Sequence, residues 1–372
     1  MIRLLLPLLL LSILIGCNKS NPHPEEIIDS KRLGQMILIG FRGAEIDGNH
    51  PIVRDLRELN IGGVVLYDYD RELGTFGRNI ESQDQLLQLS SDLISNASTP
   101  PIIAVHQDGG IESPLNKLYP TAISPFSKTH FSDSATTISY SRSFAQEFMV
   151  LGLNTNFNPR LDLKTPSNKA PTPGIISSDP EIVIQQANYI LDEYDKEHLF
   201  SVPKYFPGYS SDYHPADSTN NITDVWSENF LKPYQSLLSE RDISGIMTAH
   251  SFNANIDSVW PATLSKKTIT GLLRDSLGFK GVVISDDLQK PIITSRYDME
   301  TAIAQSLNAG VDILYFGNNF EYDKDLAPKV LRAIQQVMAD GRVSKDTVEE
   351  SLNRIEKLKK DVIEELCSCF NF

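Results

Sequence analysis

Short apolar runs alternate with amphipathic stretches along most of the chain. The apolar runs cover residues 36–41, 62–67, 101–106, 155–159, 201–206, 243–250, 281–287 and 310–316. Helical patterns lie between them, at residues 90–96, 140–151, 180–194, 229–240 and 299–308. Short buried strands that alternate with helices indicate a parallel sheet. About eight such units predict an α/β fold with one (β/α)₈ barrel of the TIM type, rather than two domains.

The C-terminal part of the chain predicts a helical extension to this barrel. Residues 323–366 are rich in charge, and their apolar positions Val330, Ile334, Val337 and Met338 recur at helical spacing. We expect this apolar stripe to pack on the barrel.

The first 16 residues predict a signal peptide. Arg3 precedes an apolar run from Leu4 to Ile15, which is too short to span a bilayer but suits a signal-peptide core. The run ends in Leu-Ile-Gly-Cys, which resembles the lipobox of a bacterial lipoprotein, so we expect Cys17 to be lipidated and to become the new N-terminus. The alternative is an ordinary secretory signal with a chance cysteine.

These segments give the predicted organisation of the chain. It comprises a signal peptide (1–16), a tether (17–29), a single barrel domain with its helical extension (30–366) and a tail (367–372). The expected location is the bacterial cell envelope, with a lipid on Cys17 as the membrane anchor. Asn18 is not the aspartate linked to inner-membrane retention in enteric bacteria, which favours the outer membrane.

The net charge and the cysteine content argue against two functions, nucleic-acid binding and zinc binding. The 372 residues carry 34 Lys+Arg against 48 Asp+Glu, a formal net charge of −14. Such an acidic protein would repel phosphate backbones, so we expect no nucleic-acid partner. Two of the three cysteines, Cys367 and Cys369, stand in the tail without a histidine cluster, so no zinc site is expected there. The sequence predicts no metal and no cofactor.

Polar residues follow several of the predicted strands. His106, Lys204 and His250 stand at the ends of three apolar runs, and Asp286 with Asp287 ends a fourth. In a TIM barrel these ends share one rim, where active sites lie. A lone carboxylate there can simply cap the next helix, but several convergent polar groups favour a site.

Four segments resemble glycoside hydrolase family 3, especially its single-domain β-N-acetylglucosaminidases. Residues 101–110 (PIIAVHQDGG) resemble IAVDQEGG of that family, and residues 152–162 (GLNTNFNPRLD) resemble GIDLNFAPVLD. Residues 204–208 (KYFPG) resemble KHFPG, and residues 264–288 end in GVVISDDL as the family does. The resemblance implies a barrel that hydrolyses β-linked sugars with retention of configuration. It assigns Asp286 as the nucleophile, with Asp287 in support.

The resemblance leaves two alignments for the acid/base. The family uses an Asp-x-His pair on a loop after KHFPG, in which the histidine protonates the leaving oxygen and the aspartate orients it. Asp212 and His214 have this chemistry but lie closer to KYFPG than the family spacing. Asp217-Ser218-Thr219 matches the other alignment, in which a threonine replaces the histidine and the site is damaged. We favour Asp212 and His214.

Several sugar-binding positions depart from the family pattern. The replacements are His106 for Asp, Ile111 for Arg, Tyr205 for His, Tyr209-Ser210 for His-Gly, Gly174-Ile175-Ile176-Ser177 for the Arg-containing RSFG, and Lys290 for Met. Lys204 and His250 are retained, and Arg160 is an added cation that could replace a lost one. We expect Lys204, His106 and His250 to bind the sugar.

Three functions are consistent with the sequence. The first is a lipid-anchored, metal-free retaining glycosidase acting on β-linked N-acetylhexosamine or a related sugar of cell-wall or other glycan fragments. The second is a barrel that has lost catalysis and binds a glycan or a partner protein. The third is an envelope lipoprotein that uses the barrel only as a scaffold. We favour the first because the nucleophile strand is intact.

Overall fold

The computed structural model describes residues 28–109, 113–116, 118, 133–165, 174–209 and 220–364. Several of the residues singled out above lie outside the described residues: Cys17, Ile111, Ser210, Asp212, His214, Asp217, Ser218, Thr219 and both tail cysteines.

Parallel strands form the centre of the molecule. They are β1 (Ile37–Gly40), β2 (Gly63–Val65), β5 (Ile102–Val105), β6 (Thr155–Asn156), β7 (Phe200–Ser201), β8 (Lys204–Phe206), β10 (Gly245–Thr248), β12 (Val282–Ile284) and β13 (Leu314–Phe316). Hydrogen bonds order them as β13-β1-β2-β5-β6-β7 and β12-β10-β8. The two sets join because β7 leads into β8 two residues later and because Ile284 bridges Ile313. The predicted TIM-type barrel is therefore confirmed. Seven of the eight apolar runs each contain one of these strands, and the run at residues 201–206 overlaps both β7 and β8.

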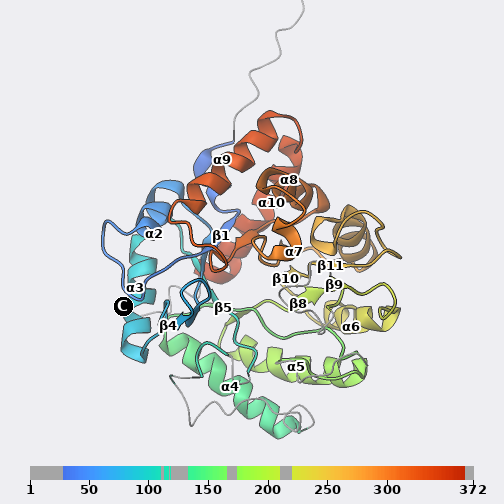
Figure 1. The fold of residues 1–372 in the computed structure, drawn as a ribbon. Coiled ribbons are helices and arrows are strands. Elements are labelled where there is room, and N and C mark those ends of the chain that lie inside the picture. The colour runs from blue at the N-terminus through green and yellow to red at the C-terminus, as the bar shows by residue number, and fades with distance from the viewer. Residues whose placement is uncertain are drawn as a thin grey trace, which may run out of the picture.

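Helices surround the strands as a ring (Figure 1). The helical segments before the last three are α1 (Ser30–Gly34), α2 (Pro51–Arg54), η1 (Asp55–Leu59), α3 (Gln83–Asn96), α4 (Ser134–Val150), α5 (Pro180–Lys196), η3 (Glu228–Leu231), α6 (Lys232–Glu240), η4 (Ala262–Leu264), η5 (Lys267–Ser276), α7 (Pro291–Thr294) and α8 (Met299–Ala309). Side-chain caps set several starts: Ser82, Asp133, Asp179 and Asp298 each accept a hydrogen bond from a first-turn N–H. The Ser82 cap starts α3 seven residues before the predicted helix at residues 90–96.

Two pairs of short strands lie in the loops that follow barrel strands. β3 (Tyr69–Asp70) and β4 (Thr75–Phe76) form an antiparallel hairpin after β2. β9 (Asn220–Asn221) and β11 (Ser251–Phe252) pair in parallel after β8 and β10. Both pairs belong to the rim at the carboxyl ends of the barrel strands.

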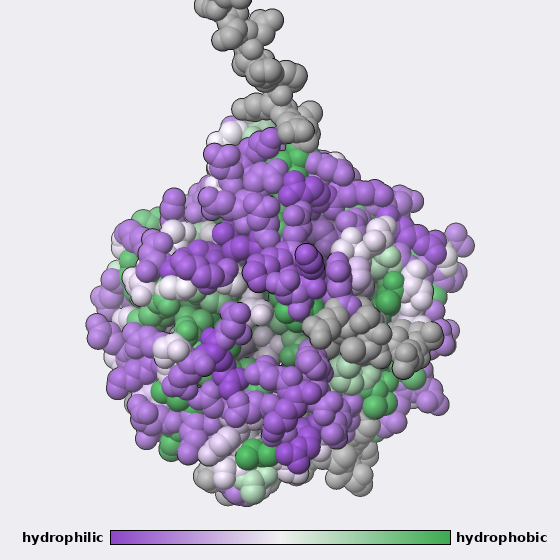
Figure 2. Space-filling view, turned by 180° about the vertical axis from the view of Figure 1, so that it is seen from behind, coloured by the Kyte–Doolittle hydropathy of each residue, from purple (hydrophilic) through white to green (hydrophobic). Residues whose placement is uncertain are grey.

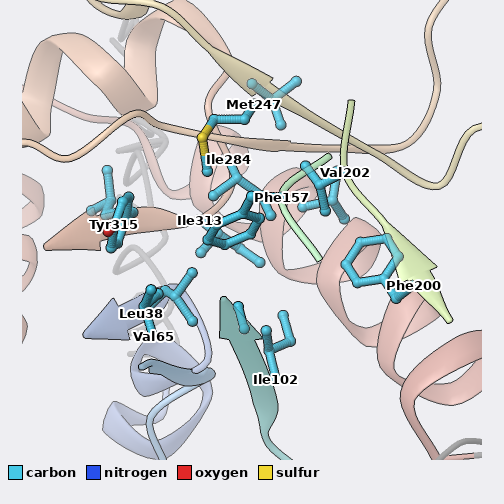
Figure 3. Close-up of a cluster of buried hydrophobic side chains, with 14 of the residues drawn as sticks. Leu38, Val65, Ile102, Phe157, Phe200, Val202, Met247, Ile284, Ile313 and Tyr315 are labelled. Carbon is cyan, nitrogen blue, oxygen red and sulfur yellow. The ribbon is translucent and has the colours of Figure 1, made fainter. Parts of the chain in front are cut away.

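Apolar side chains from successive strands fill the barrel interior (Figure 3). Leu38, Val65, Ile102, Met247 and Ile284 are each at most 1% exposed. They come from β1, β2, β5, β10 and β12 and converge in one cluster. Full burial of each such side chain contributes about 1.5–3 kcal/mol, so this cluster is a major source of the fold's stability.

Three helical segments end the described chain: the first packs beside α8 and α1 on the outside of the barrel, and the other two cover the end opposite to the rim. They are α9 (Leu326–Ala339), α10 (Lys345–Leu358) and η6 (Lys359–Ile363), with Ser344 capping α10. The Nζ atom of Lys359 donates to the carbonyl oxygens of Gly62 and Pro100, at 2.5 and 2.6 Å, just before β2 and β5. The predicted stripe packs on the barrel, because Val330, Ile334 and Val337 are fully buried.

The outer surface is predominantly hydrophilic on the face opposite to that of Figure 1, and its apolar residues are scattered (Figure 2). Within the described ranges, no helix combines the length and the apolar character needed to cross a bilayer.

Candidate active site

Asp286 lies two residues beyond β12, at the rim of the barrel. Its side chain is 2% exposed, and its backbone N–H donates to Oγ1 of Thr248, the last residue of β10. Oδ1 accepts the backbone N–H of Asp287 at 2.8 Å. The ammonium of Lys290 contacts both carboxylate oxygens, at 2.8 and 2.7 Å. Burial raises the pKa of Asp286, but Lys290 together with His250 and the Asp287 N–H outweighs it and holds that pKa below its usual value, so the carboxylate stays ionised.

Asp287 faces the neighbouring strand end instead. Its Oδ1 accepts the backbone N–H groups of Gly317 and Gln289, at 2.8 and 3.0 Å. Burial raises its pKa to about 6. A Cβ at position 317 would lie 2.3 Å from the Asp287 Oδ2, so only glycine allows this close approach. Asp287 therefore ties the end of β12 to the end of β13, which fits a supporting role beside Asp286.

His250 contacts the backbone of the same turn through its imidazole ring. Its Nε2 lies 2.9 Å from the backbone oxygen of Asp287, and its Nδ1 lies 2.9 Å from Oγ1 of Thr263. Burial lowers the pKa of His250 to about 4, so the ring is neutral near pH 7. A carbonyl oxygen can only accept, so Nε2 carries the proton. Both ring nitrogens are therefore engaged within the protein.

Lys204, the first residue of β8, is the cation at the centre of the rim. Its side chain is fully buried, and its Nζ lies 2.7 Å from Oδ2 of Asp108 and 3.3 Å from Nδ1 of His106. Burial and the charges of Lys204 and Lys290 lower the pKa of His106 well below its usual value, so this ring is neutral too. Asp108 is 17% exposed and also accepts from Nδ2 of Asn158.

An aromatic and hydroxyl chain continues from His106. Its ring lies 4.8 Å from that of Phe157 and 5.9 Å from that of Tyr315, centroid to centroid. Nε2 of His106 lies 3.4 Å from the Tyr315 hydroxyl, which in turn contacts the Tyr67 hydroxyl. Phe157 and Tyr315 are in the barrel cluster of Figure 3, so the polar site rests directly on the apolar core.

Arg160 forms the third ion pair of the rim. Its guanidinium binds Asp162 through two bonds, at 3.0 and 2.7 Å, and lies 4.8 Å from the centre of the Tyr205 ring. Burial lowers the pKa of Arg160, but the ion pair with Asp162 raises it more. The pKa of Arg160 therefore lies above its usual value. Tyr205 has a φ of +78° and stacks on Tyr209 at 4.9 Å. The added cation is thus held mainly by a carboxylate of its own segment.

The structure brings together most of the residues predicted for the site. His106, His250 and Asp286 follow the ends of β5, β10 and β12, and they gather at one rim with Lys204. Lys204 was predicted to end a strand, whereas it is the first residue of β8. The roles assigned to them stay predictions, as do those of Asp212 and His214. The sequence treated Lys290 only as a departure from the family, whereas here it touches the predicted nucleophile. The hydroxyl chain of Tyr67 and Tyr315 was missed, since nothing distinguishes these residues from core aromatics in the sequence.

In the described part of the chain, no group of three or more His, Cys, Asp or Glu side chains is placed to hold a metal ion.

The sequence matches known proteins over nearly all of the described barrel. The profile of the "Glycosyl hydrolase family 3 N terminal domain" matches residues 28–358. A protein of Tolumonas auensis named beta-hexosaminidase is 30% identical over 295 residues, which is 76% of this chain and 83% of that protein.

Solved structures of low identity share the fold. A glycoside hydrolase family 3 beta-N-acetylglucosaminidase from Paenibacillus is 22% identical, with a TM-score of 0.78 over 92% of this chain. This chain spans 63% of the length of that protein. A beta-N-acetylhexosaminidase from Beutenbergia cavernae is 20% identical, with a TM-score of 0.74 over 89% of this chain and 98% of that one.

Proposed function

The chain belongs to glycosyl hydrolase family 3, and from this membership we propose that it is a retaining β-N-acetylhexosaminidase-like enzyme with Asp286 as nucleophile. One observation carries the proposal: a buried carboxylate stands at the end of a barrel strand and is kept ionised by its neighbours. A nucleophile has to be ionised to attack, and the rim of a TIM barrel is where such groups act.

The proposed reaction has two steps. In the first, an oxygen of Asp286 forms a bond to C1 of the sugar, while the bond from C1 to the leaving oxygen breaks. The electron pair goes to that oxygen, which takes a proton from the acid/base residue. In the second step a water attacks C1, gives its proton to the same residue and expels Asp286 as a carboxylate. The sugar leaves with its original configuration.

Residues around Asp286 would then hold the sugar. Lys204 and His106 share one hydrogen-bonded chain at the rim and can present their polar atoms to sugar hydroxyls. We assign His250 to the same site as a positioning residue, because both of its ring nitrogens are engaged within the protein and its hydrogen bond to the Asp287 carbonyl fixes the turn that carries Asp286. Truncating a charged hydrogen-bond partner of the sugar would cost about 1.5–3 kcal/mol of binding.

We propose His214 as the acid/base and Asp212 as its orienting carboxylate. The support is chemical: an imidazole can give and take a proton near neutral pH, and an adjacent carboxylate favours its charged form. Thr219, the candidate of the other alignment, has no such capacity.

The proposed substrate class follows the relatives' names, which are beta-hexosaminidase for the T. auensis protein and for a second one from Nitrosomonas eutropha. We infer β-linked N-acetylhexosamine or a related sugar in cell-wall or other glycan fragments. The protein would meet such fragments in the cell envelope, anchored through a lipid on Cys17.

The test is turnover of p-nitrophenyl β-glycosides by the chain beginning at Asn18. The panel includes an N-acetylglucosaminide and sugars that carry a carboxylate. Asp286→Asn should reduce turnover on every active sugar by at least about a thousandfold, because an amide cannot attack C1. His214→Ala should reduce it by about a hundredfold or more. Proton NMR of the first product should show the β-anomer.

Turnover that survives Asp286→Asn would overturn the assigned nucleophile, and turnover that survives His214→Ala would overturn the assigned acid/base. A folded protein without turnover on any sugar would instead favour the second function, glycan binding on an inherited barrel. The ion pair between Lys290 and Asp286 is the observation that supports this second function, because it occupies the proposed nucleophile.

A further inference from the structure

Lys290 covers the proposed nucleophile. It stands four residues after Asp286, just before α7, and its ammonium contacts both oxygens of that carboxylate. The Lys290 side chain is 21% exposed, whereas that of Asp286 is only 2% exposed. The lysine is thus the accessible member of the pair, and it occupies the two oxygens that an attack on C1 would use.

The reaction disturbs this ion pair more than its neighbours. Two other pairs of the rim, Lys204 with Asp108 and Arg160 with Asp162, keep their charges throughout. When Asp286 becomes an ester, its negative charge is lost and the Lys290 ammonium loses its counter-charge. Before that, positive charge develops on the sugar ring close to this ammonium. For a neutral sugar, both effects oppose the glycosylation step.

Among the described residues, each carboxylate near Lys290 already has a partner of its own. The carboxylates of Asp108 and Asp162 are bound to Lys204 and Arg160. Asp287 directs one oxygen to the backbone N–H groups of Gly317 and Gln289. His106 is neutral and has no negative charge to offer. A carboxylate carried by the ligand would supply the counter-charge that these described residues do not.

We propose that Lys290 determines specificity and that the substrate is an anionic glycoside, whose carboxylate binds Lys290 and thereby frees Asp286. The inference rests on the proposed function and names the substrate class of the same site. A lysine suits this exchange, because its ammonium sits on a flexible four-carbon stem and can turn from one carboxylate to another. A bound anion also supplies the counter-charge that the ester removes, so it stabilises the covalent intermediate.

The test compares matched glycosides. p-Nitrophenyl N-acetyl-β-muramide and N-acetyl-β-glucosaminide differ by one carboxylate-bearing ether, and the β-glucuronide places the carboxylate elsewhere on the ring. The unmutated protein should prefer at least one anionic sugar in kcat/KM. Lys290→Met should lower the ratio of anionic to neutral turnover by about ten- to a hundredfold, with the neutral sugar gaining in absolute rate. Lys290→Arg should keep the anionic preference.

Lys280→Met is the matched control, because it removes an exposed lysine near the start of β12. It should leave the ratio unchanged. A preference of the unmutated protein for the neutral sugar, or a Lys290→Met variant with an unchanged ratio, would overturn the proposal. The proposed function fails separately, through turnover that survives Asp286→Asn.

Calorimetry with glucuronate, N-acetylmuramic acid and N-acetylglucosamine gives a second readout that needs no turnover. At least one of the two acids should bind the unmutated protein about tenfold or more tightly than Lys290→Met. If both acids bound the two proteins equally, the anionic class would be wrong.

Discussion

Charged side chains at the rim are arranged as close pairs. Lys204, Arg160 and Lys290 each hold one carboxylate, at distances of 2.7 Å. Burying a charge is costly unless it is paired, and removing one partner of a buried pair typically costs about 3–5 kcal/mol. The pairing therefore lets ionised groups persist in a site that sits on the apolar core. It also means that any variant of this rim has to be checked for folding before its activity is interpreted.

Glu147 is a carboxylate without such a partner. It lies on α4, and within the described part of the chain its Oε2 atom is buried with no hydrogen-bond partner. Burial raises its pKa from 4.5 to about 7. In the folded protein this group binds its proton more tightly than in the unfolded chain, so its contribution to stability falls as pH rises from about 4.5 to about 7 and is constant above.

We predict that Glu147→Gln removes this loss. The variant should be more stable than the unmutated protein by about 1 kcal/mol at pH near 8, because no charge is then buried without a partner. The gain should shrink as pH falls through about 7 toward about 4.5. Urea denaturation at several pH values measures the difference. Glu58→Gln, at an exposed position, controls for the loss of one charge, and a Glu147→Gln gain that does not vary with pH would contradict the argument.

Sequence reasoning found the site residues that end strands. His106, His250 and Asp286 were identifiable because these polar residues follow buried strands, and strand ends of a barrel share one rim. Lys204 was identified through the KYFPG motif, although it begins β8 instead of ending a strand. The aromatic residues Tyr315 and Tyr67, which contact each other beside the site, were not identifiable from the apolar runs. Tyr315 belongs to β13 and Tyr67 follows β2 closely, so their hydroxyl contact emerges only when the barrel brings the two strands around β1.

At the scale of whole elements, the barrel strands were predictable and the rim strands were not. Buried parallel strands give continuous apolar runs, as in β1 and β12, although the short strand β6 consists of the polar residues Thr155 and Asn156. The β3–β4 hairpin gives no such run, since Tyr69, Thr75 and Phe76 are exposed and their pairing depends on the loop between them. The same reason explains why α3 was predicted too short: its first turn is polar and depends on the Ser82 cap.

Asp312 connects several elements at the N-terminal end of the barrel. It is fully buried, and its Oδ2 accepts from Nη2 of Arg274 in η5 and from the backbone N–H of Val283 in β12. Its Oδ1 accepts from Nε of Arg354 in α10. One carboxylate thereby binds two helices and a strand beside the start of β13.

We predict that Asp312→Ala destabilises the fold by about 3–5 kcal/mol, because it leaves Arg274 and Arg354 without their shared counter-charge. Asp312→Asn keeps one acceptor oxygen and should cost less. Denaturant midpoints measure both losses. Asp275→Ala, an exposed change within η5, is the control and should stay within about 0.5 kcal/mol of the unmutated protein. A loss below about 1 kcal/mol for Asp312→Ala would show that the elements hold together without this residue.

For the whole molecule, the C-terminal helices are part of the barrel and not an appendage. Arg354 and Lys359 reach residues at the starts of β13, β2 and β5, so α10 and η6 close the end opposite to Asp286. Structural contacts thus concentrate at one end of the barrel and the candidate chemistry at the other. This separation is typical of TIM-barrel enzymes. It is the reason that substitutions at Asp312 and at Lys290 should have separable effects on stability and specificity.

Membrane attachment belongs to the whole molecule as well, because the folded surface offers little for it. The formal net charge of −14 opposes binding to anionic lipids, so a lipid on Cys17 would have to supply the attachment. We predict that the full chain, expressed in a bacterium, enters the detergent phase and incorporates labelled fatty acid. Cys17→Ser should lose both properties, whereas Cys367→Ser should keep them. Unlabelled protein in the aqueous phase would instead indicate an ordinary secretory signal. The chain beginning at Asn18 should keep its full rate on small glycosides in either case, since none of the residues assigned to the reaction precedes it.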